Sequence, residues 1–211
     1  MDKYQLVFII VLMGRNAHIP ATDTQQFIIE KSYAVFNKKG FAGTSIADIE
    51  KITGLTKGSI YANFKDKEDV SVKVFEYNYD LMRKALQTRV INETTAKRKL
   101  EACINFYLEF YPTLVSNGGC VLQNALIDSD DANPLLFESA RKALKSWRQH
   151  IVEIIERGIK MQEFKTEVIA EEYAYYIIAV IEGAILVSKS INNQSIFKAI
   201  LSKLSAEIIE M

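Results

Sequence analysis

Apolar side chains recur at intervals of three and four residues along much of the chain. One series lies between residues 100 and 114, and another lies between residues 137 and 154. The first consists of Leu100, Cys103, Tyr107, Phe110 and Leu114, and the second of Phe137, Ala140, Leu144, Trp147, Ile151 and Ile154. These intervals place residues on one face of an α-helix, and no β-hairpin signal is present. The sequence therefore predicts an all-α fold whose helices each bury one face.

Residues 24–69 follow a plan of shorter helices. A first helix is expected over Thr24–Lys39. Ser45 is a suitable N-cap for a second helix, because Asp48 follows three residues later and can complete a capping box. Gly54 ends that helix, since glycine readily adopts the left-handed conformation, and Thr56 caps a third. Two short helices joined by a tight turn containing glycine predict a helix-turn-helix.

The outer face of the third helix carries small and polar groups. Lys57, Ser59, Tyr61 and Asn63 lie on it, and Gly58 would let the backbone approach a ligand closely. A helix-turn-helix places its second helix, which is the third helix of this stretch, in the DNA major groove. Free N–H groups at the start of a helix bind phosphate oxygens. The spacing thus favours DNA binding, with a plain helical hairpin in an all-α protein as the alternative.

The same stretch resembles the N-terminal DNA-binding domain of TetR/AcrR transcriptional regulators. The matching segments are Ile28-Ile29-Glu30, Val35-Phe36, Lys39-Gly40-Phe41, Thr44-Ser45-Ile46, Asp48-Ile49, Gly54-Leu55-Thr56-Lys57-Gly58, Tyr61-Ala62-Asn63-Phe64 and Lys65-Asp66-Lys67-Glu68. On these positions the resemblance implies phosphate contacts by Thr44, Lys57, Tyr61 and Lys67, and base-edge contacts by Thr56, Gly58, Ser59 and Asn63. Tyr61 packing on the helix surface and Lys67 as a solvated charge are the alternatives.

The last two expected helices, at about 169–190 and 195–210, carry more apolar surface than one buried stripe requires. The residues concerned are Tyr173, Ile177, Val180, Ile181, Ala184, Ile185, Ile196, Ile200, Leu204 and Ile208. Such surface indicates an oligomer seam, with ordinary core packing as the alternative. Members of the family dimerise through their last two helices, so the resemblance implies a homodimer.

The regulatory half is expected to hold a small-molecule effector between helices, in a pocket that is mostly apolar and aromatic. The candidate ligand-binding residues are Phe106, Tyr107, Phe110, Tyr111, Asn124, Trp147, Tyr176 and Glu182. Trp147 lies on a core seam, and core packing explains it better than ligand binding does. Glu182 is either an anchor for a polar ligand group or a charge paired at the dimer seam.

Gly119-Cys120, with Asn124 four residues after the cysteine, resembles the Gly-Cys motif of one branch of the family. A helix N-terminus lowers the pKa of a thiol and favours the reactive thiolate. Cys120 is therefore a possible redox or electrophile sensor. The alternative is a small buried hydrophobic residue.

Charge is distributed unevenly along the chain. The 211 residues have a net charge of zero, yet residues 24–67 hold seven lysines against four acidic residues, a net charge of +3. This local positive charge suits a DNA-binding module. Cys103 and Cys120, with two histidines, have no metal-ligand spacing, and no phosphate loop or nucleophile motif is present. We expect no metal, no cofactor and no enzymatic activity.

Residues 1–23 are interpreted as an N-terminal extension. The apolar run from Leu6 to Met13 follows Lys3 and is too short to span a bilayer. We favour translation beginning at Met13, in which case residues 1–12 are not native. An additional apolar helix and a targeting segment are the alternatives.

The chain is thus expected to have three parts: the extension at 1–23, a three-helix helix-turn-helix DNA-binding domain at 24–69, and a helical-bundle regulatory domain for ligand binding and dimerisation at 70–211. The expected function is that of a cytoplasmic repressor. It would bind a palindromic double-stranded DNA operator as a homodimer, be released by a small molecule, and have no membrane partner. A redox-sensing repressor acting through Cys120 and a helical ligand-binding protein that does not use its helix-turn-helix are the alternatives, and an activator is also compatible with the sequence.

Overall fold

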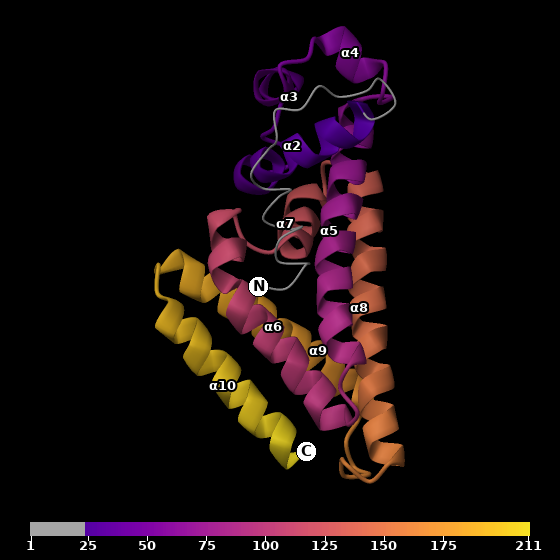
Figure 1. Cartoon of the computed structure of the whole chain (residues 1–211), viewed down its shortest axis with the longest axis vertical. Coiled ribbons are helices and arrows are strands. Elements are labelled where there is room, and N and C mark those ends of the chain that lie inside the picture. Colours follow the sequence, from indigo (N-terminus) through magenta and orange to yellow (C-terminus); the bar gives the residue numbers. More distant parts are fainter. Residues whose placement is uncertain (1–23) are drawn as a thin grey trace. The chain divides into compact units, whose positions relative to one another are not determined.

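The structure is a computed structural model, and it describes residues 24–211 (Figure 1). Within this range all regular elements are helices. They are α2 (Thr24–Lys39), α3 (Ile46–Thr53), α4 (Lys57–Tyr61), α5 (Lys67–Ile91), α6 (Ala96–Ser116), α7 (Val121–Ser129), α8 (Pro134–Lys160), α9 (Ala170–Ser190) and α10 (Gln194–Glu210). The all-α prediction is confirmed. The expectations for residues 1–23 lie outside the described part of the chain.

The chain divides into two compact units that do not follow its linear order. Among the described residues, the first unit contains Thr24–Met82 together with Val121–Arg141, and the second contains Arg83–Cys120 and Lys142–Met211. Helices α5 and α8 each contribute residues to both units. Helix α7 therefore belongs with the helix-turn-helix, whereas the division expected at residue 70 assigns it to the regulatory part.

The first unit is built on a small apolar core shared by its short helices. Ile28 and Phe36 of α2, Ile49 of α3 and Ile60 of α4 are completely buried. The Phe36 ring stacks on Phe41, with 5.3 Å between the ring centroids. Each short helix is thus held by tertiary packing, because helices of five and eight residues are not stable alone.

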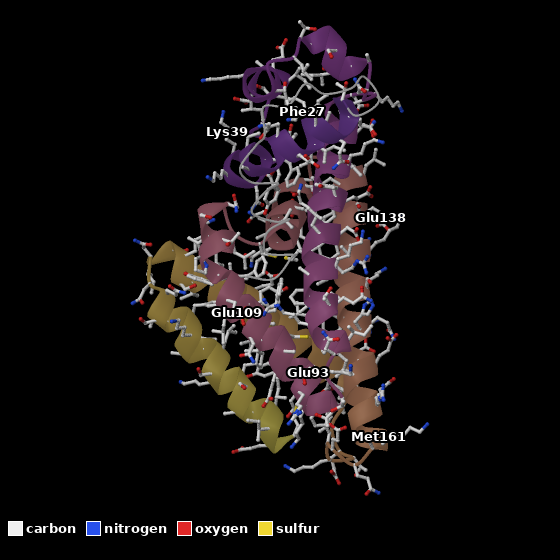
Figure 2. The ribbon with its side chains drawn as sticks, in the orientation of Figure 1. Phe27, Lys39, Glu93, Glu109, Glu138 and Met161 are labelled. Atoms are coloured by element: carbon white, nitrogen blue, oxygen red, sulfur yellow. The ribbon has the colours of Figure 1, made fainter. Side chains whose placement is uncertain are left out.

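In the second unit, helices α6, α9 and α10 pack against one another. Leu100 and Phe106 of α6 and Leu201 of α10 are buried to 1% exposure or less. Tyr111 of α6 stacks on Phe197 of α10 with 4.3 Å between ring centroids. The charged side chain of Glu109 in this unit is exposed, as are those of Lys39 and Glu138 in the first unit (Figure 2).

Gly158, near the end of α8, is a point of close approach in the second unit. A Cβ atom at this position would lie 2.2 Å from Cδ2 of Phe164 and 2.8 Å from the Cβ of Ala96. We expect Gly158→Ala to lower the free energy of unfolding by about 2 kcal/mol, because overpacking outweighs the better helix propensity of alanine. Urea unfolding measures this difference.

Gly58→Ala is the matched control for that substitution. Gly58 is exposed, and the nearest atom to an added Cβ is Oγ1 of Thr56, 3.9 Å away. Its unfolding free energy should stay within about 0.5 kcal/mol of the unmodified protein. Equal stability of the Gly158 and Gly58 variants would show that the close packing at Phe164 is wrong.

Candidate nucleic-acid interface

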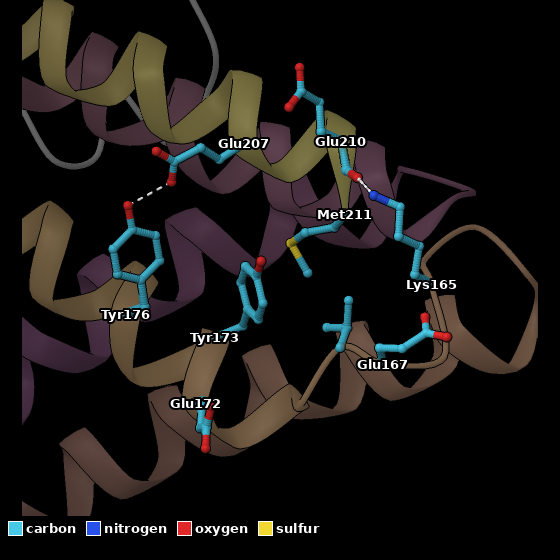
Figure 3. A pocket seen from close by; sticks show the side chains of 9 residues that line it. Lys165, Glu167, Glu172, Tyr173, Tyr176, Glu207, Glu210 and Met211 are labelled. Carbon is cyan, nitrogen blue, oxygen red and sulfur yellow. Dashed lines mark hydrogen bonds between the residues drawn. The ribbon is translucent and has the colours of Figure 1, made fainter.

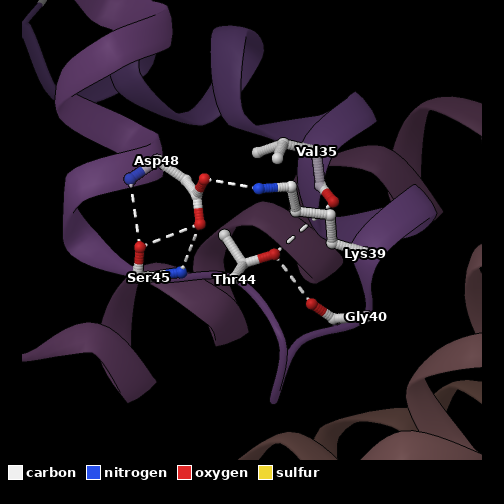
Figure 4. Close-up of polar contacts among 6 residues, drawn as sticks. All are labelled: Val35, Lys39, Gly40, Thr44, Ser45 and Asp48. Atoms are coloured by element: carbon white, nitrogen blue, oxygen red, sulfur yellow. Dashed lines mark hydrogen bonds and ion pairs between the residues drawn. The ribbon is translucent and has the colours of Figure 1, made fainter.

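The capping box of α3 fixes the start of the helix-turn-helix. The Ser45 hydroxyl accepts the Asp48 N–H at 3.2 Å, and Asp48 Oδ2 accepts the Ser45 N–H at 2.9 Å (Figure 4). Lys39 Nζ donates to Asp48 Oδ1 at 2.5 Å. The hydrogen bond from Lys39, followed by that from the Ser45 backbone, holds the pKa of Asp48 well below its usual range. Asp48 therefore stays ionised at physiological pH and fastens the end of α2 to α3.

Thr44, for which the resemblance implies a phosphate contact, is hydrogen-bonded within the first unit. Its side chain is buried to 1% exposure, and its hydroxyl donates to the Gly40 carbonyl at 2.7 Å and lies 3.4 Å from the Val35 carbonyl (Figure 4). A hydroxyl has one hydrogen to donate, and here that hydrogen is used inside the protein. Thr44 thus fastens the loop between α2 and α3 with its hydroxyl.

Gly54 and Thr56 form the turn between α3 and α4 as expected. Gly54 has φ 72° and donates its N–H to the Glu50 carbonyl at 2.8 Å, which ends α3. The Thr56 hydroxyl accepts the Ser59 N–H at 3.3 Å and caps α4. The Lys57 N–H is also bound, since it donates to Glu50 Oε1 at 2.7 Å. The expectation that free first-turn N–H groups meet phosphates is therefore corrected for Lys57 and Ser59.

The exposed side of α4 consists mainly of residues expected to contact DNA. Thr56, Lys57, Gly58 and Tyr61 are exposed, and Ser59 is half-buried. Lys57 Nζ lies 5.8 Å from the centroid of the Tyr61 ring, in cation–π geometry. This contact orients an ammonium group and an aromatic ring on the same side of the helix. The phosphate backbone of a DNA duplex could reach both groups there.

Asn63 and Lys67 are partly engaged within the first unit. The Asn63 side-chain amide donates to the Ser59 carbonyl at 2.9 Å, and its backbone carbonyl accepts from Gln25 Nε2 at 2.7 Å. Lys67 Nζ donates to the Ala42 carbonyl at 3.0 Å. A lysine ammonium has three donors, so this bond leaves Lys67 further donors while fixing its position.

The sequence did not identify the contribution of α7 to this unit. Asp128 Oδ2 accepts the Ala42 N–H at 2.9 Å, and Asn124 Nδ2 donates to Asn37 Oδ1 at 2.9 Å. These pairs are 86 and 87 residues apart along the chain, so no local pattern could have indicated them. Asn124, expected in the effector pocket, lies instead against the end of α2, in a different unit from the other ligand-binding candidates.

Most of the remaining effector candidates form a buried aromatic cluster in the second unit. Phe106 stacks on Phe110 with 4.4 Å between centroids, and Tyr107 stacks on Trp147 at 5.8 Å. All four are at most 8% exposed. Tyr111 is also buried, but it stacks on α10. The expected residue types are therefore brought together, with their rings packed on one another.

Tyr176 lies elsewhere, on an open surface pocket of about 660 Å³ (Figure 3). It is 42% exposed, and its hydroxyl donates to Glu207 Oε2 at 2.6 Å, which raises its pKa. The pocket is lined by Lys165, Glu167, Val168, Glu172, Tyr173, Tyr176, Glu207, Glu210 and Met211. None of the other seven ligand-binding candidates lines it.

Cys120 and Glu182 form a buried pair in the second unit. The Cys120 thiol, which is 0% exposed, lies 3.1 Å from Glu182 Oε1 and donates to it. Burial raises the pKa of Glu182 to about 7, and the thiol hydrogen bond offsets part of that shift. Cys120 immediately precedes α7, as expected, but its sulfur is buried and not exposed to solvent.

Two further features of residues 24–211 concern metal binding and membrane spanning. No group of three His, Cys, Asp or Glu side chains in this range is arranged to hold a metal ion. Within the same range, every helix is too short or too polar to cross a membrane.

Comparison with known proteins adds the relationships of the whole chain. A family model described as Bacterial regulatory proteins, tetR family, matches residues 28–72. A second, described as Tetracyclin repressor-like, C-terminal domain, matches residues 96–203. Among curated proteins, the HTH-type transcriptional repressor DhaR of Mycobacterium sp. (strain GP1) is 25% identical over 82% of this chain and 86% of its own.

Solved structures agree with these matches. A TetR-family transcriptional regulator from Cytophaga hutchinsonii is 36% identical, with a TM-score of 0.84 over 92% of this chain and 98% of its own. A TetR transcriptional regulator from Chloroflexus aurantiacus is 30% identical, also with a TM-score of 0.84, over 89% of this chain and 95% of its own. Both similarities extend through the helix-turn-helix and the helices that follow.

Proposed function

We propose that this chain, which belongs to the TetR family of transcriptional regulators, is a repressor. It binds a palindromic operator as a homodimer. Members of this family bind DNA through their helix-turn-helix and are not enzymes. The proposal rests on the exposed face of α4, where Lys57 Nζ lies beside the Tyr61 ring on a helix capped by Thr56. Repression is supported by the repressor DhaR among the relatives.

On this proposal the residues of α4 divide by chemistry. Lys57 and Tyr61 contact phosphates, because an ammonium and a phenol are donors that phosphate oxygens accept. Thr56, Gly58, Ser59 and Asn63 lie closest to base edges in the major groove. Lys67 contacts a phosphate with the donors left by its bond to Ala42, and Thr44 supports the loop from inside.

Lys57→Ala tests the phosphate assignment. We expect affinity to fall for every duplex tested, and the slope of log K against log salt to become less steep by about one, because one counterion-releasing contact is lost. Fluorescence anisotropy over a series of salt concentrations measures both quantities. Lys145→Ala, which removes an exposed lysine from α8 in the second unit, should leave both unchanged. An unchanged slope for Lys57→Ala would remove Lys57 from the interface.

The proposed dimer forms through α9 and α10. Tyr176, Ala179, Leu186 and Val187 of α9 are exposed in the single chain, and their spacing places them on one side of the helix. Gly183 lies on the same side with open space around its Cα, so a second helix could approach closely there. Ile196 and Ile209 add exposed apolar surface on α10. A two-fold seam would cover this surface and present two copies of α4 to successive half-sites.

We further propose that a small-molecule effector binds the second unit at the aromatic cluster of Phe106, Tyr107, Phe110 and Trp147. These rings supply the apolar lining typical of ligand pockets. The effector must bind the form that cannot hold the operator more tightly than the form that can, since equal affinity shifts no equilibrium. In this proposal residues 24–69 bind DNA and residues 70–211 regulate that binding, in the cytoplasm.

Trp147 provides a direct test of the effector site, because it is the single tryptophan of the chain. A compound that releases the protein from DNA should also change Trp147 fluorescence at the same concentrations. A releasing compound that leaves the fluorescence unchanged would place the site elsewhere. The contact between Cys120 and Glu182 gives the redox alternative a defined location, but the complete burial of the thiol supports the effector mechanism over it.

A further inference from the structure

Glu50 joins the two helices of the helix-turn-helix through a hydrogen bond of its side chain. It lies in α3, is half-buried, and its Oε1 accepts the N–H of Lys57 at 2.7 Å. Lys57 is the first residue of α4. The bond therefore runs across the turn, from the side of one helix to the first residue of the next.

The position of α4 depends on few contacts. The helix has five residues, and its buried side chain is Ile60, near the C-terminal end, with Phe64 buried just beyond the helix. Its N-terminal end carries Lys57 and Gly58, both of which are exposed. Apolar packing thus holds the later part of α4, and the Glu50 carboxylate holds its beginning. A helix this short has little stability of its own to resist tilting.

We infer that Glu50 is a positioning residue for sequence recognition, which sets the angle of α4 by holding the Lys57 N–H. The inference rests on the proposed function, and it deepens that function by naming what fixes the base-reading residues. Tilting the start of α4 would move Gly58 and Ser59 relative to base edges, where direct readout needs hydrogen-bond geometry. Phosphate contacts carry no sequence information, so a change in them alters the affinity for all sequences alike. Loss of the bond should therefore reduce discrimination between sequences more than affinity in general.

Two substitutions separate the reach of Glu50 from its charge. Glu50→Asp keeps the negative charge, but its side chain is one methylene too short to hold the Lys57 N–H in the same geometry. Glu50→Gln keeps the length and an amide oxygen that can accept the bond, while it removes the charge. The measured quantity is the ratio of operator affinity to affinity for unrelated duplex DNA. The operator probe is the tightest site selected from random double-stranded DNA.

We expect Glu50→Asp to lower this ratio about tenfold with little change in affinity for unrelated DNA. Glu50→Gln should keep the ratio within about twofold, while affinity for all DNA rises because one negative charge has left the protein. Glu68→Gln, which removes an exposed charge at the start of α5 in the same unit, is the control for charge alone. It should resemble Glu50→Gln in its ratio.

Different results would overturn the positioning role of Glu50 and the proposed function of the chain. A ratio for Glu50→Asp equal to that of the unmodified protein, or an equal fall in Glu50→Asp and Glu50→Gln, would overturn the positioning role alone. An unmodified protein with no preference for any sequence would overturn the proposed function and this inference with it.

Discussion

Replacing Leu186 by glutamate is expected to convert the proposed dimer to monomers and to lower operator affinity by at least about 100-fold. Leu186 is 51% exposed in the single chain and lies on the side of α9 that also carries Tyr176, Ala179 and Val187. In a two-fold seam each substitution occurs twice, so two carboxylates would enter an apolar interface without partners. The linkage between the two half-site contacts would then be lost.

Size-exclusion chromatography with light scattering measures the oligomeric state, and titration followed by fluorescence anisotropy measures the operator affinity. Leu135→Glu is a matched control, because Leu135 is 64% exposed but lies on α8 within the first unit. It should remain a dimer with normal operator affinity. If Leu186→Glu stayed dimeric, or if Leu135→Glu dissociated equally, the proposed seam would be in the wrong place.

Glu182 is expected to make the unmodified protein less stable as the pH rises through the range from about 4.5 to about 7. Its pKa is raised in the folded state by burial, so between these values the folded protein holds a proton that the unfolded chain has released. The folded state is thereby favoured at the low end of the range, and this advantage is lost as the pH increases. The shift corresponds to a loss on the order of 3 kcal/mol by about pH 8.

Glu182→Gln isolates this effect, because glutamine has nearly the same shape and stays neutral. The free energy of unfolding of both proteins is measured in urea at about pH 5 and about pH 8. From about pH 5 to about pH 8, the free energy of unfolding of the unmodified protein should fall relative to that of the variant. Parallel pH profiles for the two proteins would mean that the carboxylate beside Cys120 is not buried as described.

The features of the helix-turn-helix that could be predicted from sequence are those encoded by neighbouring residues. Ser45 and Asp48 form the expected capping box, Gly54 adopts the expected left-handed conformation, and Thr56 caps α4. Each signal acts within three or four residues, so it does not depend on how the rest of the chain folds. Helical periodicity likewise identified the long helices and the all-α class.

Features set by tertiary distances could not be predicted in this way. The bonds from α7 to α2 and its loop join residues more than 80 positions apart, and they assign Asn124 to a unit that no sequence pattern suggested. The bond from Glu50 to the Lys57 N–H and the inward turn of the Thr44 hydroxyl depend on side-chain rotamers. Aromatic spacing on α6 indicated a buried face, but the same spacing fits a packed core and a ligand pocket equally well.

In the proposed function, a pair of α4 helices reads a two-fold symmetric DNA sequence. Selection of bound duplexes from a random double-stranded DNA pool tests it most directly, because no operator has to be assumed. We expect enrichment of one inverted repeat whose half-site centres lie about one helical turn, or a multiple of it, apart. Two copies of the chain should bind each repeat. Recovery of no common sequence, or of an asymmetric site bound by a single chain, would contradict it.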